Sequence, residues 1–286
     1  MVNIKGLPYL LLGSNYTKLA INYRNMQTHC YSIFHPYHYE ASRYLDSFLE
    51  TEPDFPYTEE IVKPVDRVIY IFWTGDNDIT PNRMIGIRSM EERCDVPVKL
   101  ITPKNIQEFI VEGDPIPEAY QYLSLNHRSD YLRSYFMYHH GGGYADIKTY
   151  FHSWVRAFDK LDASPNAYAI GYPEIGFEGA ANHDMPEGNL KKDLHYHWRY
   201  LIGNGAFICR PHTRMAAEWH TVVRHRLLSY SEQLEAHPAQ DIFGKNEDYP
   251  IPWSGMQGSI FHPLCLKYHN CLLKDKALMP SFENYR

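Results

Sequence analysis

The chain has 286 residues, of which 44% are apolar and 22% charged, as in ordinary soluble globular domains. Its 17 Gly and 19 Pro are too few for a collagen-like or low-complexity chain. The formal net charge of −6 and the lack of a basic stripe argue against nucleic acid as a partner. The 24 Tyr and 16 His are the unusual feature, because such rings stack on flat ligands and hydrogen-bond to hydroxyls.

Residues 1–63 are predicted to form an N-terminal extension packed on a main domain at 64–286. The extension is rich in Tyr and His, with an expected helix at 39–49 and an acidic, Pro-containing linker at 50–56. The apolar run at 7–12 lacks the basic region and cleavage site of a signal peptide, and no run approaches 18 apolar residues. We therefore expect a cytoplasmic protein, with peripheral contact at the inner membrane face left open.

The main domain begins with a β-branched and aromatic run at 65–73, typical of a buried parallel strand. Thr80 before Pro81 predicts a helix to about residue 94, followed by a strand at 97–101 and a helix at 105–111. A longer helix is expected at 127–140, started by Ser129 and Asp130, with strands at 144–147, 168–172 and 206–209 and a helix at 213–230. This order predicts an α/β fold with a mainly parallel sheet flanked by helices.

Candidate ligand-binding residues follow the predicted strands, where open α/β sheets bind their ligands. Trp73, Thr74 and Gly75 come directly after the first strand. Three consecutive glycines, 141–143, precede a strand that ends near Asp146, and they indicate close backbone packing there. The five Cys have no CxxC spacing and are expected to be reduced thiols. Tyr side chains of the long helix are expected to be core residues: Tyr131, Tyr135 and Tyr138.

One segment combines Ser129-Asp130-x-x-Arg133, a helix, the glycines with Tyr144, and then Asp146. This order resembles glycosyltransferase family thirty-two, sugar transferases with a DXD motif. This family includes yeast-type mannosyltransferases and bacterial capsule and lipopolysaccharide transferases. The resemblance covers roughly residues 65–262.

The resemblance implies a GT-A fold and retaining transfer of a hexose from a nucleotide-sugar, UDP-linked, to an oligosaccharide or glycolipid acceptor, in bacterial surface polysaccharide synthesis. Trp73 and Thr74, with Gly75, would bind the base and ribose. Asp130 and Arg133 would contact the donor sugar and diphosphate, Asn204 would lie near the reacting sugar, and Trp253 would close over the diphosphate. Asp146 matches the first Asp of DXD, which implies a divalent metal, manganese, at this residue.

One departure from the family pattern is Lys148, which stands where the second Asp of DXD would be. Either Asp146 and another acid, Asp76 or Asp248, hold the metal, or Lys148 itself neutralises the diphosphate. A third alternative is a weak or inactive module that binds nucleotide-sugar or glycan. No carboxylate is assigned as a nucleophile, although Asp184 is a candidate by its loop position. A metal hydrolase built on His183, Asp184, His195 and His197 has little support, and oligomeric state is not predicted.

Overall fold

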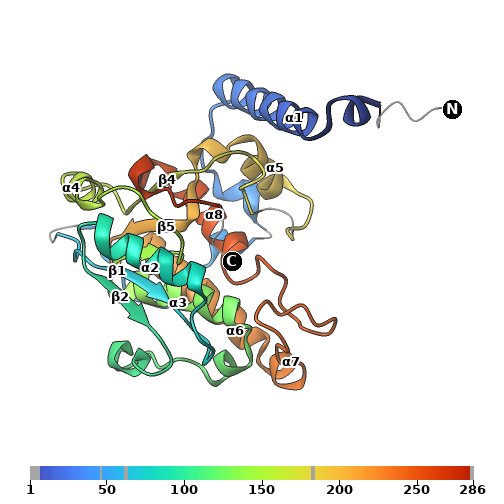
Figure 1. The fold of residues 1–286 in the computed structure, drawn as a ribbon. Coiled ribbons are helices and arrows are strands. Elements are labelled where there is room, and N and C mark those ends of the chain that lie inside the picture. Colours follow the sequence, from blue (N-terminus) through green and yellow to red (C-terminus); the bar gives the residue numbers. More distant parts are fainter. Residues whose placement is uncertain (1–6, 46, 61–63, 182–183, 284–286) are drawn as a thin grey trace.

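The structure is a computed structural model that describes residues 7–45, 47–60, 64–181 and 184–283. A six-stranded sheet with the order β2-β1-β3-β5-β4-β6 forms its centre (Figure 1). The strands are β1 Ile69–Phe72, β2 Val98–Ile101, β3 Gly142–Ala145, β4 Ala169–Pro173, β5 Ile202–Cys209 and β6 Leu272–Lys274. β5 is antiparallel to β3 and β4, whereas the other three pairings are parallel. The predicted α/β class, a mostly parallel sheet flanked by helices consistent with a GT-A fold, is confirmed.

Eight α-helices surround this sheet in the described part of the chain. They are α1 Leu7–Phe34, α2 Pro81–Arg93, α3 Leu125–His139, α4 Val155–Asp162, α5 Asn189–Tyr196, α6 Arg214–Ser229, α7 Ser231–Ala236 and α8 Gly258–Lys267. Alternating side chains of β1 enter two separate cores, as the period of two in a strand requires. Ile69 and Ile71 pack with α2 and α4, and Tyr70 and Phe72 pack with α3 and its neighbours. The central strands β1 and β3 are therefore buried on both faces.

Local signals explain where the helices begin. Thr80 caps α2 by accepting a hydrogen bond from the Arg83 amide, with Pro81 in the first turn, as predicted. The predicted start of α3 at Ser129 and Asp130 is wrong. Ser124 is the capping residue, so Asp130 lies in the second turn. The helices expected at 39–49 and 105–111 are also wrong in type, because only short 3-10 turns form there, at Ala41–Tyr44, Phe48–Glu50 and Ile106–Phe109.

The glycines after α3 have a packing role. Gly141 and Gly142 have positive φ angles of 64° and 79°, which glycine adopts without a steric penalty. A Cβ atom at Gly142 would lie 3.1 Å from the Val68 carbonyl oxygen. These glycines let the chain leave α3 and pair β3 directly beside β1, which places Asp146 at the end of the sheet.

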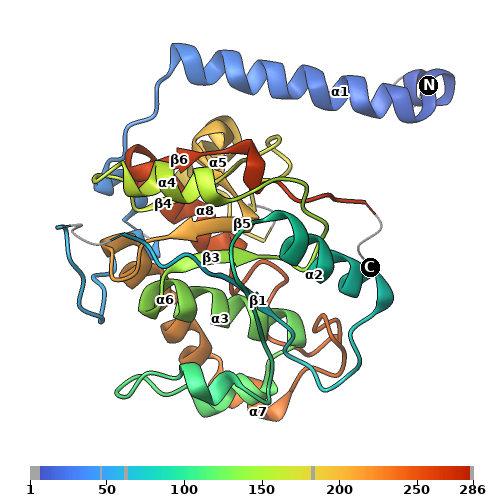
Figure 2. The same cartoon turned by 60° about the vertical axis from the view of Figure 1, so that its left-hand side comes forward.

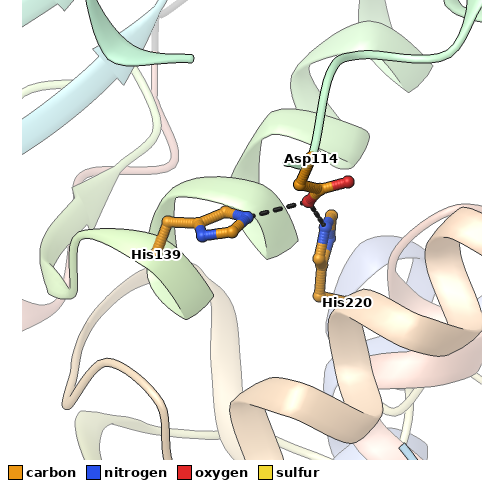
Figure 3. Close-up of side chains that lie close together, drawn as sticks. All are labelled: Asp114, His139 and His220. Carbon is orange, nitrogen blue, oxygen red and sulfur yellow. Dashed lines mark hydrogen bonds and ion pairs between the residues drawn. The ribbon is translucent and has the colours of Figure 1, made fainter. Parts of the chain in front are cut away.

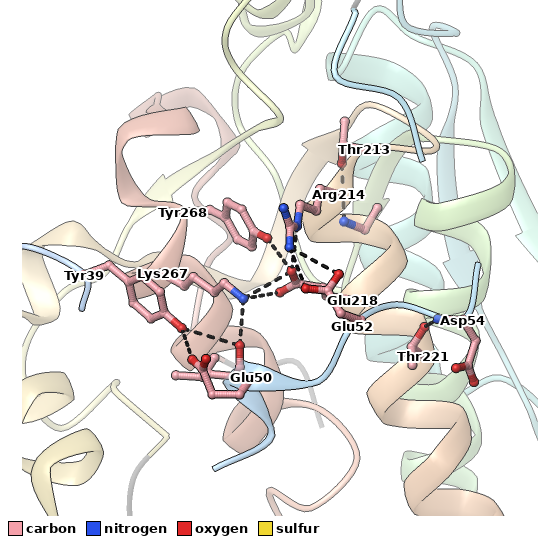
Figure 4. A network of polar contacts seen from close by, with 12 residues as sticks. Tyr39, Glu50, Glu52, Asp54, Thr213, Arg214, Glu218, Thr221, Lys267 and Tyr268 are labelled. Atoms are coloured by element: carbon pink, nitrogen blue, oxygen red, sulfur yellow. Dashed lines mark hydrogen bonds and ion pairs between the residues drawn. The ribbon is translucent and has the colours of Figure 1, made fainter. Parts of the chain in front are cut away.

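The segment from residue 39 to 54 is fastened to α6 and α8 by polar contacts (Figure 4). Glu218, 2% exposed, accepts hydrogen bonds from Lys267 and Tyr268 and pairs with Arg214. Lys267 also donates to the Leu49 carbonyl oxygen, over 2.7 Å. These contacts join the N-terminal part of the chain to the main domain, and the boundary at residue 63 stays a prediction.

Helix α1 was not predicted from the sequence. It lies along one side of the molecule in both views, with its N-terminal end extending past the domain (Figures 1 and 2). Within the described residues, each helix falls short of the length or apolarity needed to cross a membrane.

Candidate active site

A cavity of about 870 Å³ opens at the carboxyl ends of β1 and β3, large enough for a nucleotide-sugar. All nine predicted site residues line it, although they come from distant parts of the sequence: Trp73, Thr74, Gly75, Asp130, Arg133, Asp146, Lys148, Asn204 and Trp253. β5 runs antiparallel, so its first residues reach the same edge where β3 ends. The fold therefore brings the predicted residues together, and their individual roles stay predictions.

Asp146 is the centre of a charged cluster in this cavity. Its Oδ1 accepts a hydrogen bond from the Tyr144 hydroxyl at 2.7 Å and pairs with Arg133 at 3.2 Å. Its Oδ2 accepts a hydrogen bond from Lys148 Nζ at 2.9 Å. Burial alone would raise the pKa of Asp146, but Lys148 and Arg133 outweigh it and lower this pKa below its ordinary value. Asp146 is therefore ionised, with a cation on each oxygen.

Asp130 lies in a different environment, although Arg133 is 3.4 Å away. Burial raises the pKa of Asp130, and the attraction of Arg133 only partly offsets it. Arg133 is closer to Asp146 and its guanidinium lies over the Tyr144 ring, 4.5 Å from the centroid. The predicted pair of Asp130 and Arg133 on one helix face is present, and it extends to Asp146.

The aromatic and hydroxyl residues predicted for the nucleotide lie in the wall of the cavity. The Trp73 indole N–H donates to the Asn77 carbonyl oxygen, which fixes the ring orientation. The Thr74 hydroxyl donates to the Leu125 carbonyl oxygen at 2.7 Å. Trp253 is 53% exposed and packs only against Phe243 among the aromatic rings, at 5.9 Å. Its side chain is thus accessible to a ligand in the cavity.

Several residues that line the cavity carry a buried polar atom without a hydrogen-bond partner among the described residues. These atoms are Arg133 Nε, Asn204 Oδ1, Ser254 Oγ and both side-chain amide atoms of Gln257. Gln257 is only 4% exposed, and such groups are costly to bury unless something satisfies them. Ser254 and Gln257 were not identified from the sequence, because lone polar residues in a loop carry no spacing signal. Several residues with unsatisfied polar atoms in the wall of one cavity favour a polar ligand there.

The surroundings of Asp146 do not fit a divalent cation held by a DXD motif. Both carboxylate oxygens have cationic partners, and Lys148 replaces the second acidic ligand by an ammonium group. Asp76 and Asp248, the alternative acids, are not among the residues that line the cavity. A divalent ion on Asp146 would therefore have to displace Lys148.

A second group of metal-ligand residue types, Asp114, His139 and His220, lies outside this cavity and was not found from the sequence (Figure 3). Asp114 Oδ2 bonds to His139 Nε2 at 2.8 Å and His220 Nε2 at 2.7 Å, and Arg224 pairs with Oδ1 at 3.1 Å. These are hydrogen-bond distances, and they join the loop at residue 114 to α3 and α6.

Among the described residues, those proposed for a metal hydrolase do not form a common metal site. His197 is bonded to Ser32 on α1, and His195 packs against Phe177. Neither lines the cavity, and His183 lies outside the described residues. Asp184 does line the cavity, where its Oδ2 accepts a hydrogen bond from the Ser254 amide.

Comparison with known families gives one match, to part of the chain. Residues 41–163 match the model of a glycosyltransferase sugar-binding region containing DXD motif. The match supports a place in the glycosyltransferase superfamily. It covers less than half of the chain and includes Trp73 to Lys148, but it ends before Asn204 and Trp253. No curated protein and no solved structure shows a significant match to the chain.

The family match supports a glycosyltransferase-type domain that transfers or binds a sugar. Regions of this type typically bind a nucleotide-sugar and a divalent metal, and transfer implies a glycan acceptor. The cavity meets the first expectation in size and polarity, whereas the Asp146 surroundings do not meet the second.

Proposed function

We propose that the protein is a retaining glycosyltransferase that moves a hexose from a nucleotide-sugar to an acceptor hydroxyl. The observation that carries the proposal is that residues with unsatisfied buried polar atoms line one cavity together with Arg133 and Lys148, at the ends of β1 and β3. A UDP-linked donor and a bacterial role in capsule or lipopolysaccharide synthesis are further parts of the proposal, supported by resemblance.

The proposed reaction is a front-face substitution. The bond between the anomeric carbon and the diphosphate oxygen breaks, the acceptor oxygen bonds to the same face of that carbon, and the acceptor proton passes to the departing diphosphate. Arg133 and Lys148 are already held beside Asp146, and they would stabilise the charge that develops on the leaving group. Asn204 and Gln257 would hold the donor sugar through hydroxyl hydrogen bonds.

Lys148 is proposed to neutralise the charge of the diphosphate, as a metal ion does in DXD enzymes. The diphosphate would compete with Asp146 for the ammonium group, and the pairing at 2.9 Å keeps that group in place before the donor arrives. Transfer should then proceed in the presence of a chelator.

The acceptor is proposed to bind in a second cavity of about 410 Å³, next to the first. The two cavities share Glu178, Gly179 and Asn204 in their walls. The second also contains Glu174 and, from α1, Asn25. The lining offers carboxylate and amide oxygens and contains no cationic residue. Such a wall binds the hydroxyls of a neutral sugar better than it binds a phosphate. Burial raises the pKa of Glu174, as expected for a carboxyl enclosed beside an apolar wall.

A module that binds nucleotide-sugar without turnover is the second candidate. It is favoured by the charges in the cavity wall, where acidic residues outnumber basic ones by four to three. The acids are Asp130, Asp146, Glu178 and Asp184, and the cations are Arg83, Arg133 and Lys148. A diphosphate must then take a cation from an existing partner. A glycan-binding module would in turn respond to free glycans alone.

The test is a thermal-shift screen of nucleoside diphosphates, nucleotide-sugars and free glycans, followed by hydrolysis of the best donor. We expect a nucleotide-sugar to stabilise the protein in chelator and to be hydrolysed slowly. Asp146→Ala should abolish hydrolysis, because Arg133 and Lys148 lose the carboxylate that holds them in place. Asp248→Ala, at an acid outside the cavity, should not. Stabilisation by free glycan alone, or unchanged turnover in Asp146→Ala, would refute the assignment.

A further inference from the structure

Helix α1 contacts the domain largely through polar side chains, unlike the usual surface helix. The face toward the domain carries Asn25, Thr28 and Ser32, which hydrogen-bond to the Phe177 amide, the Trp198 indole and the His197 ring. Thr28 is 3% and Ser32 9% exposed. Surface helices normally turn apolar residues inward. In α1, Ile21 and Tyr31 do so, but most of the large apolar residues from position 19 onward are exposed.

The solvent-facing side of α1 carries an apolar stripe, defined as Leu19, Tyr23, Met26, Cys30 and Ile33. Four of these residues are 55–60% exposed, and Cys30 is exposed as well. The intervals of four, three, four and three residues align them along one face of the helix. Phe34 at the end of α1, 79% exposed, extends the stripe. A continuous apolar stripe on an exposed helix marks a contact surface.

The charge of this segment indicates what the stripe contacts. Residues 1–39 contain three basic residues, Lys5, Lys18 and Arg24, and no acidic residue, in a chain whose net charge is −6. An aromatic and aliphatic stripe accompanied by basic residues alone is typical of helices that lie in the interface of anionic membranes. A helix pair would instead be expected to carry charges of both signs beside the stripe.

We propose that α1 docks the protein on an anionic lipid surface through the apolar stripe. The stripe is opposite the face that contacts the domain, and both views place α1 on the outside of the molecule (Figures 1 and 2). The helix can therefore lie flat on the membrane with the domain behind it. The acidic remainder of the chain is repelled by the same surface, which favours this orientation.

The test is co-flotation of the full chain with vesicles of phosphatidylcholine, with or without phosphatidylglycerol, in the absence of donor and acceptor. We expect binding to the mixed vesicles that weakens as salt rises. Replacing Tyr23, Met26 and Ile33 together by Ser should reduce binding about tenfold or more, since each loses apolar area buried in lipid.

The matched control replaces two exposed apolar residues on other helices, Ile85→Ser and Leu228→Ser, which are 56% and 42% exposed. It should bind vesicles like the wild type, and circular dichroism should show equal helix content in all variants. Loss of binding in the control would overturn the proposal. So would a wild type that ignores vesicles but forms a dimer that the triple variant dissociates, because a second copy would then cover the stripe.

Discussion

Replacing Lys148 by Gln tests the central claim about the donor site. The Lys148 ammonium group is 10% exposed and 2.9 Å from Asp146, so it lies in a region of reduced dielectric. Two unit charges about 4 Å apart interact by about 4 kcal/mol at an effective dielectric constant near 20. Because Lys148 must leave its pairing with Asp146, only part of this attraction contributes to diphosphate binding. We therefore expect Lys148→Gln to lower the affinity for a nucleoside diphosphate by about 2 kcal/mol, roughly thirtyfold.

The assay is calorimetric titration of the nucleoside diphosphate into protein kept in chelator, with Lys104→Gln as the control. Lys104 is exposed and lies outside the cavity, so its replacement should leave the affinity unchanged. If chelator abolishes wild-type binding, manganese restores it, and Lys148→Gln binds as well as the wild type, then Lys148 does not replace a metal ion. Lys148→Asp gives the reverse check, because it should lose binding in chelator and regain it with manganese.

Three further substitutions test the remaining parts of the site and the core. Gln257→Ala should slow donor hydrolysis about tenfold without lowering the melting temperature, because its side-chain amide has no hydrogen-bond partner among the described residues to lose. Equal slowing by Gln107→Ala, at an exposed position, would contradict this. Glu174→Gln should raise the acceptor KM about tenfold and leave donor hydrolysis unchanged. An unchanged acceptor KM with slower donor hydrolysis would show that Glu174 does not bind the acceptor. Burial lowers the pKa of His262 from 6.5 to about 4, so the unfolded chain binds the proton first as pH falls between these values. Stability should then drop by up to about 3 kcal/mol across that window, and urea midpoints should show a flatter pH dependence in His262→Gln.

The parts of the fold that could be predicted are those with strong local signals. The run before Trp73 is β-branched and aromatic, and Thr80 with Pro81 combines a capping hydroxyl with a fixed φ angle, so both elements form where expected. Ser129 offered the same capping chemistry as Ser124, but the helix already begins one turn earlier and Ser129 is interior to it. Capping residues mark the start of a helix only when the preceding chain is not helical.

Other features depend on tertiary contacts that no local pattern records. Helix α1 has only a weak helical period, because apolar residues such as Ile21 and Tyr31 lie on its inward face as well as in the apolar stripe. Asp114, His139 and His220 are far apart in the sequence and meet only after α3 and α6 pack together. The cavity residues were predictable because Asp130, Arg133 and Asp146 form a compact motif, whereas Gln257 became identifiable only from its burial without a partner.

The two faces of α1 together bear on the choice between a soluble and a lipid-linked acceptor. Ile21 and Asn25 on its inner side line the second cavity, and the apolar stripe lies on its outer side. The two are therefore separated by about the 10–12 Å diameter of one helix. An acceptor anchored in the membrane would present its sugar within this distance of the cavity. We expect transfer to a glycolipid in anionic vesicles to be faster than transfer to the same sugar in solution. Replacing Tyr23, Met26 and Ile33 by Ser should remove this advantage without changing turnover of the soluble acceptor, and a loss of both rates would show that α1 serves the site itself and not the membrane.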